Sequence, residues 1–287
     1  MPTPQEIAIM DDMITKLANA KPYELPSTVA KAIRVVSSPR FFLRIAERAD
    51  MATSIQEKEK LTALAENLVA TVQAVVSTTE DRLDECACNV ENVVKAAAEP
   101  GSGEFLVPLL PERIQSMRKA LKRLEPSALD EGFLSTVDAW MNKSIQDGMD
   151  GMADILQKVL QIYAGTQISR ARAQLQLQVA AALTGESQDT INAAIAEQQL
   201  YDSSPAAVLF EDLLHMNTDN WDEELRNRIR RDGDDDADET KVSAAALMGE
   251  VQRTIESVVL GLENGSMAQR VQAEYLREVA SRIEALA

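Results

Sequence analysis

The fold class is decided by residues 152–183, which read MADILQKVLQIYAGTQISRARAQLQLQVAAAL. Apolar side chains recur there every three to four residues, for example at Ile155, Val159 and Ile162. This spacing places them on one side of an α-helix, whereas a half-buried strand would alternate apolar and polar residues. The stretch therefore predicts one or two long helices, which end at Gly185.

Most other segments show the same spacing, and capping residues mark where the helices begin. Ser38 followed by Pro39 has the form of an N-cap with proline at the first helical position. Ser54 and Glu57 have the spacing of a capping box. The long helix that follows either bends at 77–79 or gives way there to a new one. Helices are expected at about 5–20, 26–36, 39–50, 55–98, 112–124, 127–146, 188–200, 204–215 and 220–231.

The last part of the chain predicts a pair of antiparallel helices, at about 241–262 and 266–285. Gly265 and Ser266 supply the stop and the N-cap between them. No repeat of 34 or 40 residues is present, which argues against a helical solenoid. The predicted fold class is all-α, an irregular multi-helix bundle of about ten helices with a C-terminal αα-hairpin.

The expected domain organisation follows the acidic run at 232–239, DGDDDADE. Its like charges repel one another, so it predicts a loop or linker. We expect a main helical bundle over 1–184, short helices packing on it over 185–231, the acidic loop over 232–240 and the C-terminal helical hairpin over 241–287.

Composition narrows the classes of function. The 287 residues carry a net charge of −17, with 45% hydrophobic and only 4% aromatic residues. A field of this sign repels phosphate backbones and anionic lipid, so we predict no DNA binding and no general affinity for nucleic acid. Few aromatic residues and 11 glycines also argue against a β-sandwich or barrel.

The inventory of reactive side chains is short. One histidine and two cysteines are too few for a multi-histidine metal site, a di-iron site or a four-cysteine zinc module. We expect Cys86 and Cys88 to be a buried pair of small apolar residues whose side chains point in different directions, and His215 to stabilise a helix end. The acidic run does not fit a calcium-binding loop. The sequence therefore predicts no catalytic, cofactor-binding or metal-binding residue, and no cofactor.

The sequence also indicates no targeting signal. No run of 18 apolar residues occurs, so we expect no membrane span, and residues 1–6 lack the start of a secretory signal. The chain is expected to be cytosolic, or a mature form from which a leader has been removed, and not secreted.

Two basic clusters stand out from the acidic background. The spacing of four cations near 118–123 places them opposite the apolar stripe of their helix, so we expect one shared exposed face. Ordinary surface charge, or pairing with the acidic run, is the plainer interpretation; docking of an acidic protein segment or of RNA is the functional one. The candidate partner-binding residues are Arg113, Arg118, Lys119, Lys122, Arg123, Arg226, Arg228, Arg230 and Arg231.

Several anchors carry a resemblance to a known family: PRFFLRIAERAD at 39–50, EKEKL at 57–61, LDEGFL at 129–134, AW at 139–140 and the apolar positions of 155–163. Over about 39–165 the chain resembles plastid-targeted helical proteins of plants and algae with no established activity, some of them labelled endoribonuclease E-like. The resemblance implies a mature protein of the chloroplast stroma. Nuclease activity is not carried over, because no carboxylate–metal or S1-like barrel signature is visible.

These observations favour a non-enzymatic protein, an interaction, scaffold or assembly factor that acts as a subunit of a larger complex with protein partners. The alternative is an RNA-associated accessory factor that uses the basic helix faces. An enzyme with an unconventional carboxylate site is a third hypothesis, which would require a polar, concave pocket.

Overall fold

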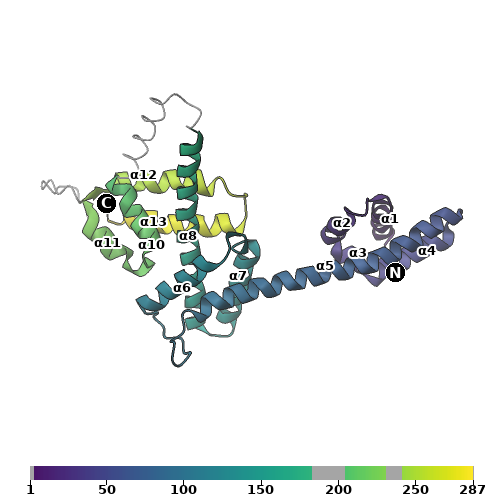
Figure 1. Cartoon of the computed structure of the whole chain (residues 1–287), viewed down its shortest axis with the longest axis horizontal. Coiled ribbons are helices and arrows are strands. Elements are labelled where there is room, and N and C mark those ends of the chain that lie inside the picture. Colours follow the sequence, from purple (N-terminus) through teal and green to yellow (C-terminus); the bar gives the residue numbers. More distant parts are fainter. Residues whose placement is uncertain (1–2, 183–203, 231–240, 287) are drawn as a thin grey trace. The chain divides into compact units, whose positions relative to one another are not determined.

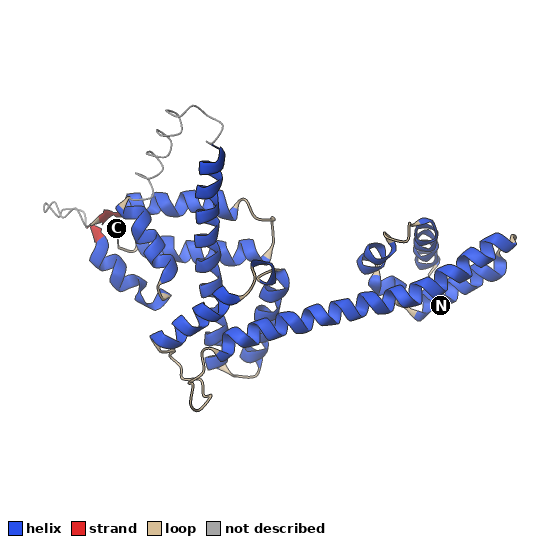
Figure 2. Ribbon diagram, in the orientation of Figure 1, coloured by secondary structure: helices blue, strands red, loops and turns tan. Residues whose placement is uncertain are grey.

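The computed structural model describes residues 3–182, 204–230 and 241–286, and these are overwhelmingly helical (Figure 1, Figure 2). Among the described residues the only strands are β1 (Ile229–Arg230) and β2 (Val242–Ser243), a two-residue parallel pair. The all-α prediction is confirmed. The helix expected at 188–200 and the acidic run at 232–239 lie outside the described residues.

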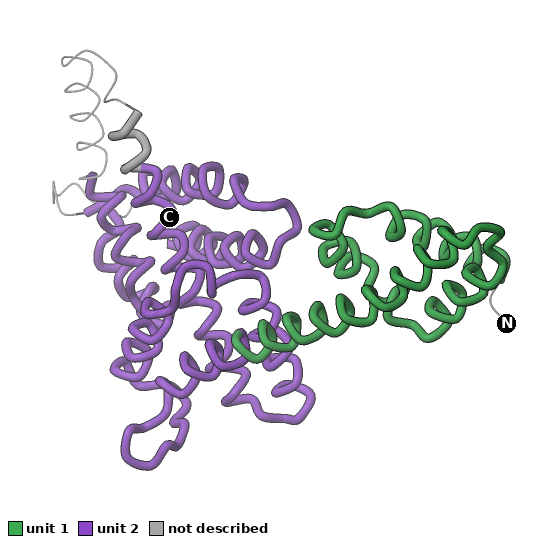
Figure 3. Tube along the Cα trace, turned by 45° about the vertical axis from the view of Figure 1, so that its right-hand side comes forward, with its two compact units in different colours: residues 1–85 green, residues 86–287 purple. Residues whose placement is uncertain are grey.

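The chain divides into two compact units, residues 1–85 and 86–287 (Figure 3). This division differs from the domains expected from the sequence, which placed the first boundary near 184. It falls inside the continuous helix α5 (Ile55–Lys95), where no glycine or proline marks it. The C-terminal hairpin belongs to the same compact unit as the central helices.

Unit 1 packs four helices against the first part of α5. They are α1 (Pro4–Asn19), α2 (Leu25–Lys31), α3 (Ile33–Val36) and α4 (Pro39–Met51). The Ser38 side chain caps α4 by accepting from the Phe41 amide, as predicted. The core of this unit is formed by Met10, Ile14, Leu17, Val29, Val36, Phe41, Ile45, Ala49, Leu61, Leu64 and Leu68.

An ion pair joins α1 to α4 at the edge of this core. Nε and Nη2 of Arg44 each donate to a carboxylate oxygen of Asp11 over 2.8 Å. Arg48 adds a hydrogen bond to the Asp11 carbonyl at 3.1 Å. The hydrogen bonds from Arg44 lower the pKa of Asp11, although burial acts in the opposite direction.

Helix α5 continues through 77–79 without a break. The hydroxyls of Thr78 and Thr79 donate to the carbonyls of Ala74 and Val75, four residues earlier, at 2.8 and 2.7 Å. Because these side chains bond back to their own helix, they do not open an alternative turn. The helix therefore contributes both to the core of unit 1 and, from Val90 onward, to that of unit 2.

Unit 2 is organised around one long helix, α8 (Asp150–Ala182), which confirms the prediction from the 152–183 pattern. Helices α6, α7, α10 and α13 all contact it. The remaining elements of the unit are α6 (Pro111–Arg123), η1 (Pro126–Ala128), α7 (Glu131–Gln146), α10 (Pro205–His215), η3 (Thr218–Asn220), α11 (Trp221–Arg228), α12 (Ala244–Thr254), the π-helical turn η4 (Ile255–Val259) and α13 (Met267–Glu284).

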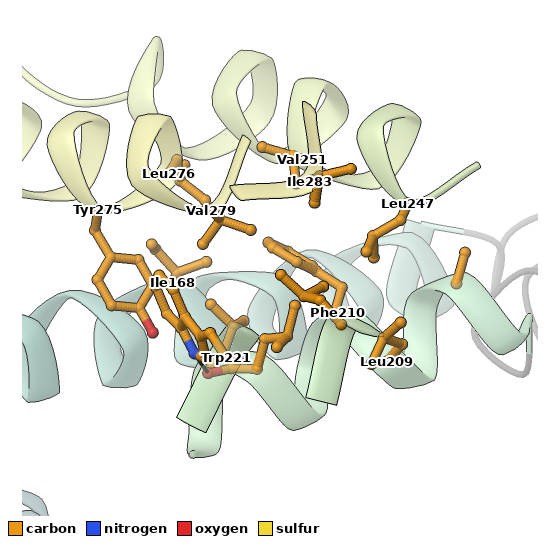
Figure 4. Packing of buried hydrophobic residues seen from close by; sticks show 14 of the residues in the cluster. Ile168, Leu209, Phe210, Trp221, Leu247, Val251, Tyr275, Leu276, Val279 and Ile283 are labelled. Atoms are coloured by element: carbon orange, nitrogen blue, oxygen red, sulfur yellow. Dashed lines mark hydrogen bonds between the residues drawn. The ribbon is translucent and has the colours of Figure 1, made fainter. Parts of the chain in front are cut away.

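Two apolar clusters meet along α8. One joins the end of α5 to α6, α7 and the first half of α8. The other joins the second half of α8 to α10–α13, with Trp221 fully buried between Phe210 and Tyr275 on neighbouring helices (Figure 4). The Trp221 indole nitrogen donates to the Leu213 carbonyl at 3.0 Å. Val271 packs against both clusters, so unit 2 has one connected core.

The C-terminal hairpin is formed by α12 and α13, which contact each other directly. Gly265 adopts a φ of 81°, a left-handed conformation that favours glycine, and Ser266 caps α13 by accepting from the Gln269 amide. The predicted cap is therefore confirmed, whereas the predicted stop was wrong: α12 ends at Thr254 and η4 at Val259, and Gly265 lies in the turn before α13. Between the two helices, the π-helical turn η4 buries the adjacent residues Val258 and Val259.

Candidate interaction surface

The basic face predicted on α6 does not exist as expected, because Arg118 is buried. Only 5% of this residue is exposed, and it lies beside Met117 and Leu121 in the core. Its Nη1 and Nη2 donate to the carbonyls of Leu214 and Met216, each at 3.2 Å, at the C-terminal end of α10. Helix C-termini attract cations because their last carbonyls lack partners. Burial lowers the pKa of Arg118.

The other cations of the first cluster separate into two groups. Arg113 is half-buried, where it donates to the Ala98 carbonyl at 3.3 Å and lies 3.9 Å from the Glu99 carboxylate. Lys119, Lys122 and Arg123 are exposed, and they pair with nothing in the part of the chain that the structure describes. Three of the five predicted cations thus remain available to a partner.

The second basic cluster is also partly used within the fold. Arg228 donates to Asp212 at 2.7 Å and to Glu224 at 3.3 Å, and the first of these hydrogen bonds is the main cause of its raised pKa. Arg226 and Arg230 are exposed. Arg231 and the acidic run that was expected to pair with it lie outside the described residues.

A stripe of exposed apolar side chains runs along residues 69–85 of α5, in unit 1. None of these 17 residues is buried. Val69, Val76 and Leu83 are 47%, 39% and 59% exposed, and they recur at intervals of seven residues on one side of the helix. Val72, between the first two, is half-buried because it packs against the core of unit 1. We call Val69, Val76 and Leu83 the α5 stripe.

Among the described residues, α5 is the one helix that is both long and apolar enough to be a candidate membrane span. By length and composition alone it could cross a membrane: an 18-residue window has a mean hydropathy of 1.2 and is 17% buried. Leu61, Leu64 and Leu68 of this helix pack into the core of unit 1, and lipid would have to replace those contacts. The absence of a membrane span stays a prediction.

In unit 2, a groove follows one side of α8. Two neighbouring hollows of about 350 and 260 Å³ share Gln157 and Gln161 of α8, and we call the two together the groove. The first is lined by residues of α8, η3, α11 and α13, and the second by residues of α8, η3 and the loop before α6. The remaining residues around the groove are Val107, Pro108, Leu109, Asp154, Lys158, Leu160, Thr218, Asp219, Trp221, Val271, Glu274, Tyr275, Glu278 and Arg282.

Hydrogen bonds from Lys158 and Arg282 hold η3 against one wall of this groove. Lys158 Nζ donates to Asn217 at 2.8 Å, to Asp219 at 3.1 Å and to Thr218 at 3.2 Å. From the opposite side, Arg282 Nη1 donates to the Thr218 carbonyl at 2.6 Å. Burial acts to raise the pKa of Asp219, but the hydrogen bonds from Lys158 and Asn217 hold it below its ordinary value.

The reactive side chains are scattered. Within the described ranges, no group of three or more histidine, cysteine, aspartate or glutamate residues is placed to hold a metal ion. Cys86 is buried and Cys88 is exposed, so the two point in different directions as predicted, whereas the expectation of a buried pair was wrong for Cys88. His215 ends α10, and its Nδ1 lies 3.0 Å from the Glu211 carbonyl, which agrees with a structural role.

Comparison of the chain with protein-family models, with curated proteins and with solved structures finds no match. The resemblance to plastid helical proteins therefore stays a prediction.

Proposed function

We propose that the protein is a non-enzymatic interaction and assembly factor, a subunit of a larger complex, which binds a helix of another protein along the α5 stripe. The observation that carries this proposal is the run of 17 helical residues, 69–85, none of which is buried although an apolar stripe follows it. The compartment that we propose, from the family resemblance, is the chloroplast stroma.

The composition of this segment makes an uncovered helix costly. Seven of the eleven residues at 69–79 are valine or threonine. Each β-branched residue lowers helix stability by roughly 0.5 kcal/mol relative to alanine, because its χ1 rotation is restricted in a helix. Most helical stability in proteins comes from burying an apolar face. A partner that covers Val69, Val76 and Leu83 would supply that burial.

The spacing and the charges define the partner. The seven-residue intervals, with Val72 and Thr79 at the intermediate positions, are those of a two-helix seam. The end of the segment carries Glu80, Asp81, Asp84 and Glu85 beside a single Arg82, so its net charge is negative. In the register of the seam only Glu80 and Arg82 flank the apolar positions, and the other three acidic residues lie on the rest of the helix surface. A second copy of this chain would bring the same net negative charge, so charge complementarity favours a partner helix that carries lysine or arginine beside its apolar stripe.

Two designed peptides test this proposal. Each contains four heptads with leucine at the seam, and the flanking positions are lysine in one and glutamate in the other. We expect the full-length protein to bind the lysine peptide in fluorescence anisotropy titrations. Binding should weaken at least about tenfold in Val69→Ala/Val76→Ala/Leu83→Ala, since the seam supplies most of the buried apolar area.

The matched control is Ile9→Ala/Leu43→Ala/Met51→Ala, which removes three exposed apolar side chains elsewhere in unit 1. It should bind the lysine peptide like the wild type. Equal binding of both peptides, or no binding of either, would overturn the proposal. So would sedimentation that shows a dimer lost on changing the α5 stripe, or vesicle binding that depends on it.

An RNA-associated role is the alternative, and it rests on the three exposed cations Lys119, Lys122 and Arg123. Arg118 must be left intact in any test, because it is buried and its loss would disturb the fold. If Lys119→Ala/Lys122→Ala/Arg123→Ala abolished binding to a single-stranded RNA and flattened its salt dependence, the alternative would be favoured. Lys119, Lys122 and Arg123 lie outside the α5 stripe, so variants at the two places test the two functions separately.

A further inference from the structure

We propose that the groove over α8 in unit 2 is a second docking site, and that it binds a short segment of a partner protein in which lysine or arginine stands beside aliphatic residues. The proposal does not depend on the α5 stripe, which lies in unit 1. It rests on the shape of the groove and on the charges that remain unused around it.

The two cations in the groove are already engaged. Lys158 is held by Asn217, Thr218 and Asp219. Arg282 donates to Glu278 at 2.8 Å as well as to the Thr218 carbonyl, and its guanidinium lies 5.2 Å from the centre of the Trp221 ring. An anionic ligand could therefore bind to Lys158 or Arg282 only by breaking the hydrogen bonds that hold η3.

Two carboxylates in the same groove have no such partner. Asp154 on α8 and Glu274 on α13 are exposed, and neither forms a hydrogen bond or ion pair with any described residue. Asp154 and Gln161 are seven residues apart, so the α8 side of the groove is about 10 Å long between them. The unused charge in the groove is therefore negative, and it complements a basic guest.

The groove also has an apolar edge. Val107 and Leu109 line the same hollow as Asp154, within a loop that reads FLVPLL at 105–110. Of this loop, Phe105, Leu106, Val107 and Leu110 are 38–48% exposed. At the other end of the groove, Leu160 and Val271 add apolar surface. A peptide segment that combined aliphatic side chains with a lysine or arginine would match both the apolar edge and the unpaired carboxylates of the groove.

The test uses the full-length protein and two fluorescent nonapeptides, one of alternating leucine and lysine and one of alternating leucine and glutamate. We expect the lysine peptide to bind and the glutamate peptide not to bind. Asp154→Asn/Glu274→Gln should weaken binding about tenfold, which is the upper range for two partly exposed ion pairs. Val107→Ser should weaken it separately, because that change removes part of the apolar edge.

The matched control is Glu223→Gln/Glu256→Gln, which removes two exposed carboxylates of unit 2 outside the groove. It has the same change in net charge and should leave binding unchanged. The variant of the α5 stripe should also bind normally, which separates this site from the proposed function. The proposal is overturned if Asp154→Asn/Glu274→Gln and Glu223→Gln/Glu256→Gln weaken binding equally, or if the glutamate peptide binds as tightly as the lysine peptide. It is also overturned if spermidine, added at the same concentration of positive charge, displaces the lysine peptide.

Discussion

Arg118 donates from Nη1 to the carbonyl of Leu214 over 3.2 Å, although 96 positions separate the two residues in the chain. Nη2 extends the contact to the Met216 carbonyl. One buried guanidinium thus links α6 to the end of α10, a helix that also packs on α8. The residue that the sequence suggested for partner binding has a structural role.

Replacement of Arg118 should destabilise unit 2. In Arg118→Met the carbonyls of Leu214 and Met216 lose their donor, and a buried polar group without a partner costs about 1–3 kcal/mol. We expect that loss in the free energy of unfolding, measured by denaturant titration followed by circular dichroism. Lys119→Met, the exposed neighbour, should change it by less than about 0.5 kcal/mol. Equal effects of the two changes would contradict the assignment.

Gly165 on α8 should not tolerate a side chain. A Cβ atom there would lie 2.5 Å from the Leu214 carbonyl oxygen and 3.0 Å from the Tyr275 hydroxyl. Overpacking of this kind costs about 1–3 kcal/mol, so Gly165→Ala should lower the midpoint of thermal unfolding. Gly249→Ala is the control, because its Cβ would meet only the Arg253 guanidinium at 3.8 Å, and we expect a small gain in stability.

The Asp11–Arg44 pair predicts an acid-sensitive contribution in unit 1. The pKa of Asp11 is lower in the folded protein than in the unfolded chain, so the pair stabilises the fold above the unfolded value of about 4. That contribution disappears as the pH falls through the lowered folded pKa. Asp11→Asn should therefore melt below the wild type at pH 7, and the two should converge once the pH lies below the folded pKa of Asp11.

Asp12→Asn provides the comparison for this measurement. Its carboxylate is exposed and pairs only with Lys16 on the same helix, at 2.7 Å. Exposed pairs of this kind contribute little, so thermal unfolding of this variant should follow the wild type across the whole pH range. A difference between the Asp11→Asn variant and the wild type that persisted unchanged at low pH would rule out the ion pair as its source.

Alanine in the α5 stripe should leave the isolated protein as stable as before, or more so. Val69→Ala and Val76→Ala each replace an exposed β-branched residue, a gain of roughly 0.5 kcal/mol in helix propensity. Leu68→Ala, one position away but fully buried, should instead cost about 2–5 kcal/mol. Denaturant titrations of the three variants test this. A large loss for Val76→Ala would mean that another part of the same chain covers the stripe.

Helices and their caps were predictable because their signals are local. Ser38 and Ser266 cap the helices that the sequence predicted, and the pattern of 152–183 yields the single helix α8. The burial of Arg118 was not predictable, since the helical spacing of α6 carries no information about the carbonyls of α10. The groove over α8 was not predictable either, because it is formed by segments about 165 residues apart in sequence, from Val107 to Val271. No local sequence pattern indicates it.

The division of the chain inside α5 was missed for a different reason. Its boundary near Glu85 lies in an uninterrupted helix, so no helix-breaking residue marks it. The heptad spacing of Val69, Val76 and Leu83 was visible in the sequence, but spacing alone cannot tell an exposed stripe from a buried one. The excess of β-branched residues over 69–79 was the available signal that this helix depends on contacts beyond its own backbone.

The two cores also complete at different times during synthesis. Every buried residue of the unit 1 core lies between Met10 and Leu68. The core of unit 2 joins Val90 to Ile283, so it cannot close until α13 has been made. Because domains fold as they emerge from the ribosome, unit 1 can fold while α6–α13 are still being translated. Until α13 has been made, the apolar faces of α8 and α10 lack part of their cover, so the nascent chain exposes apolar surface that promotes aggregation.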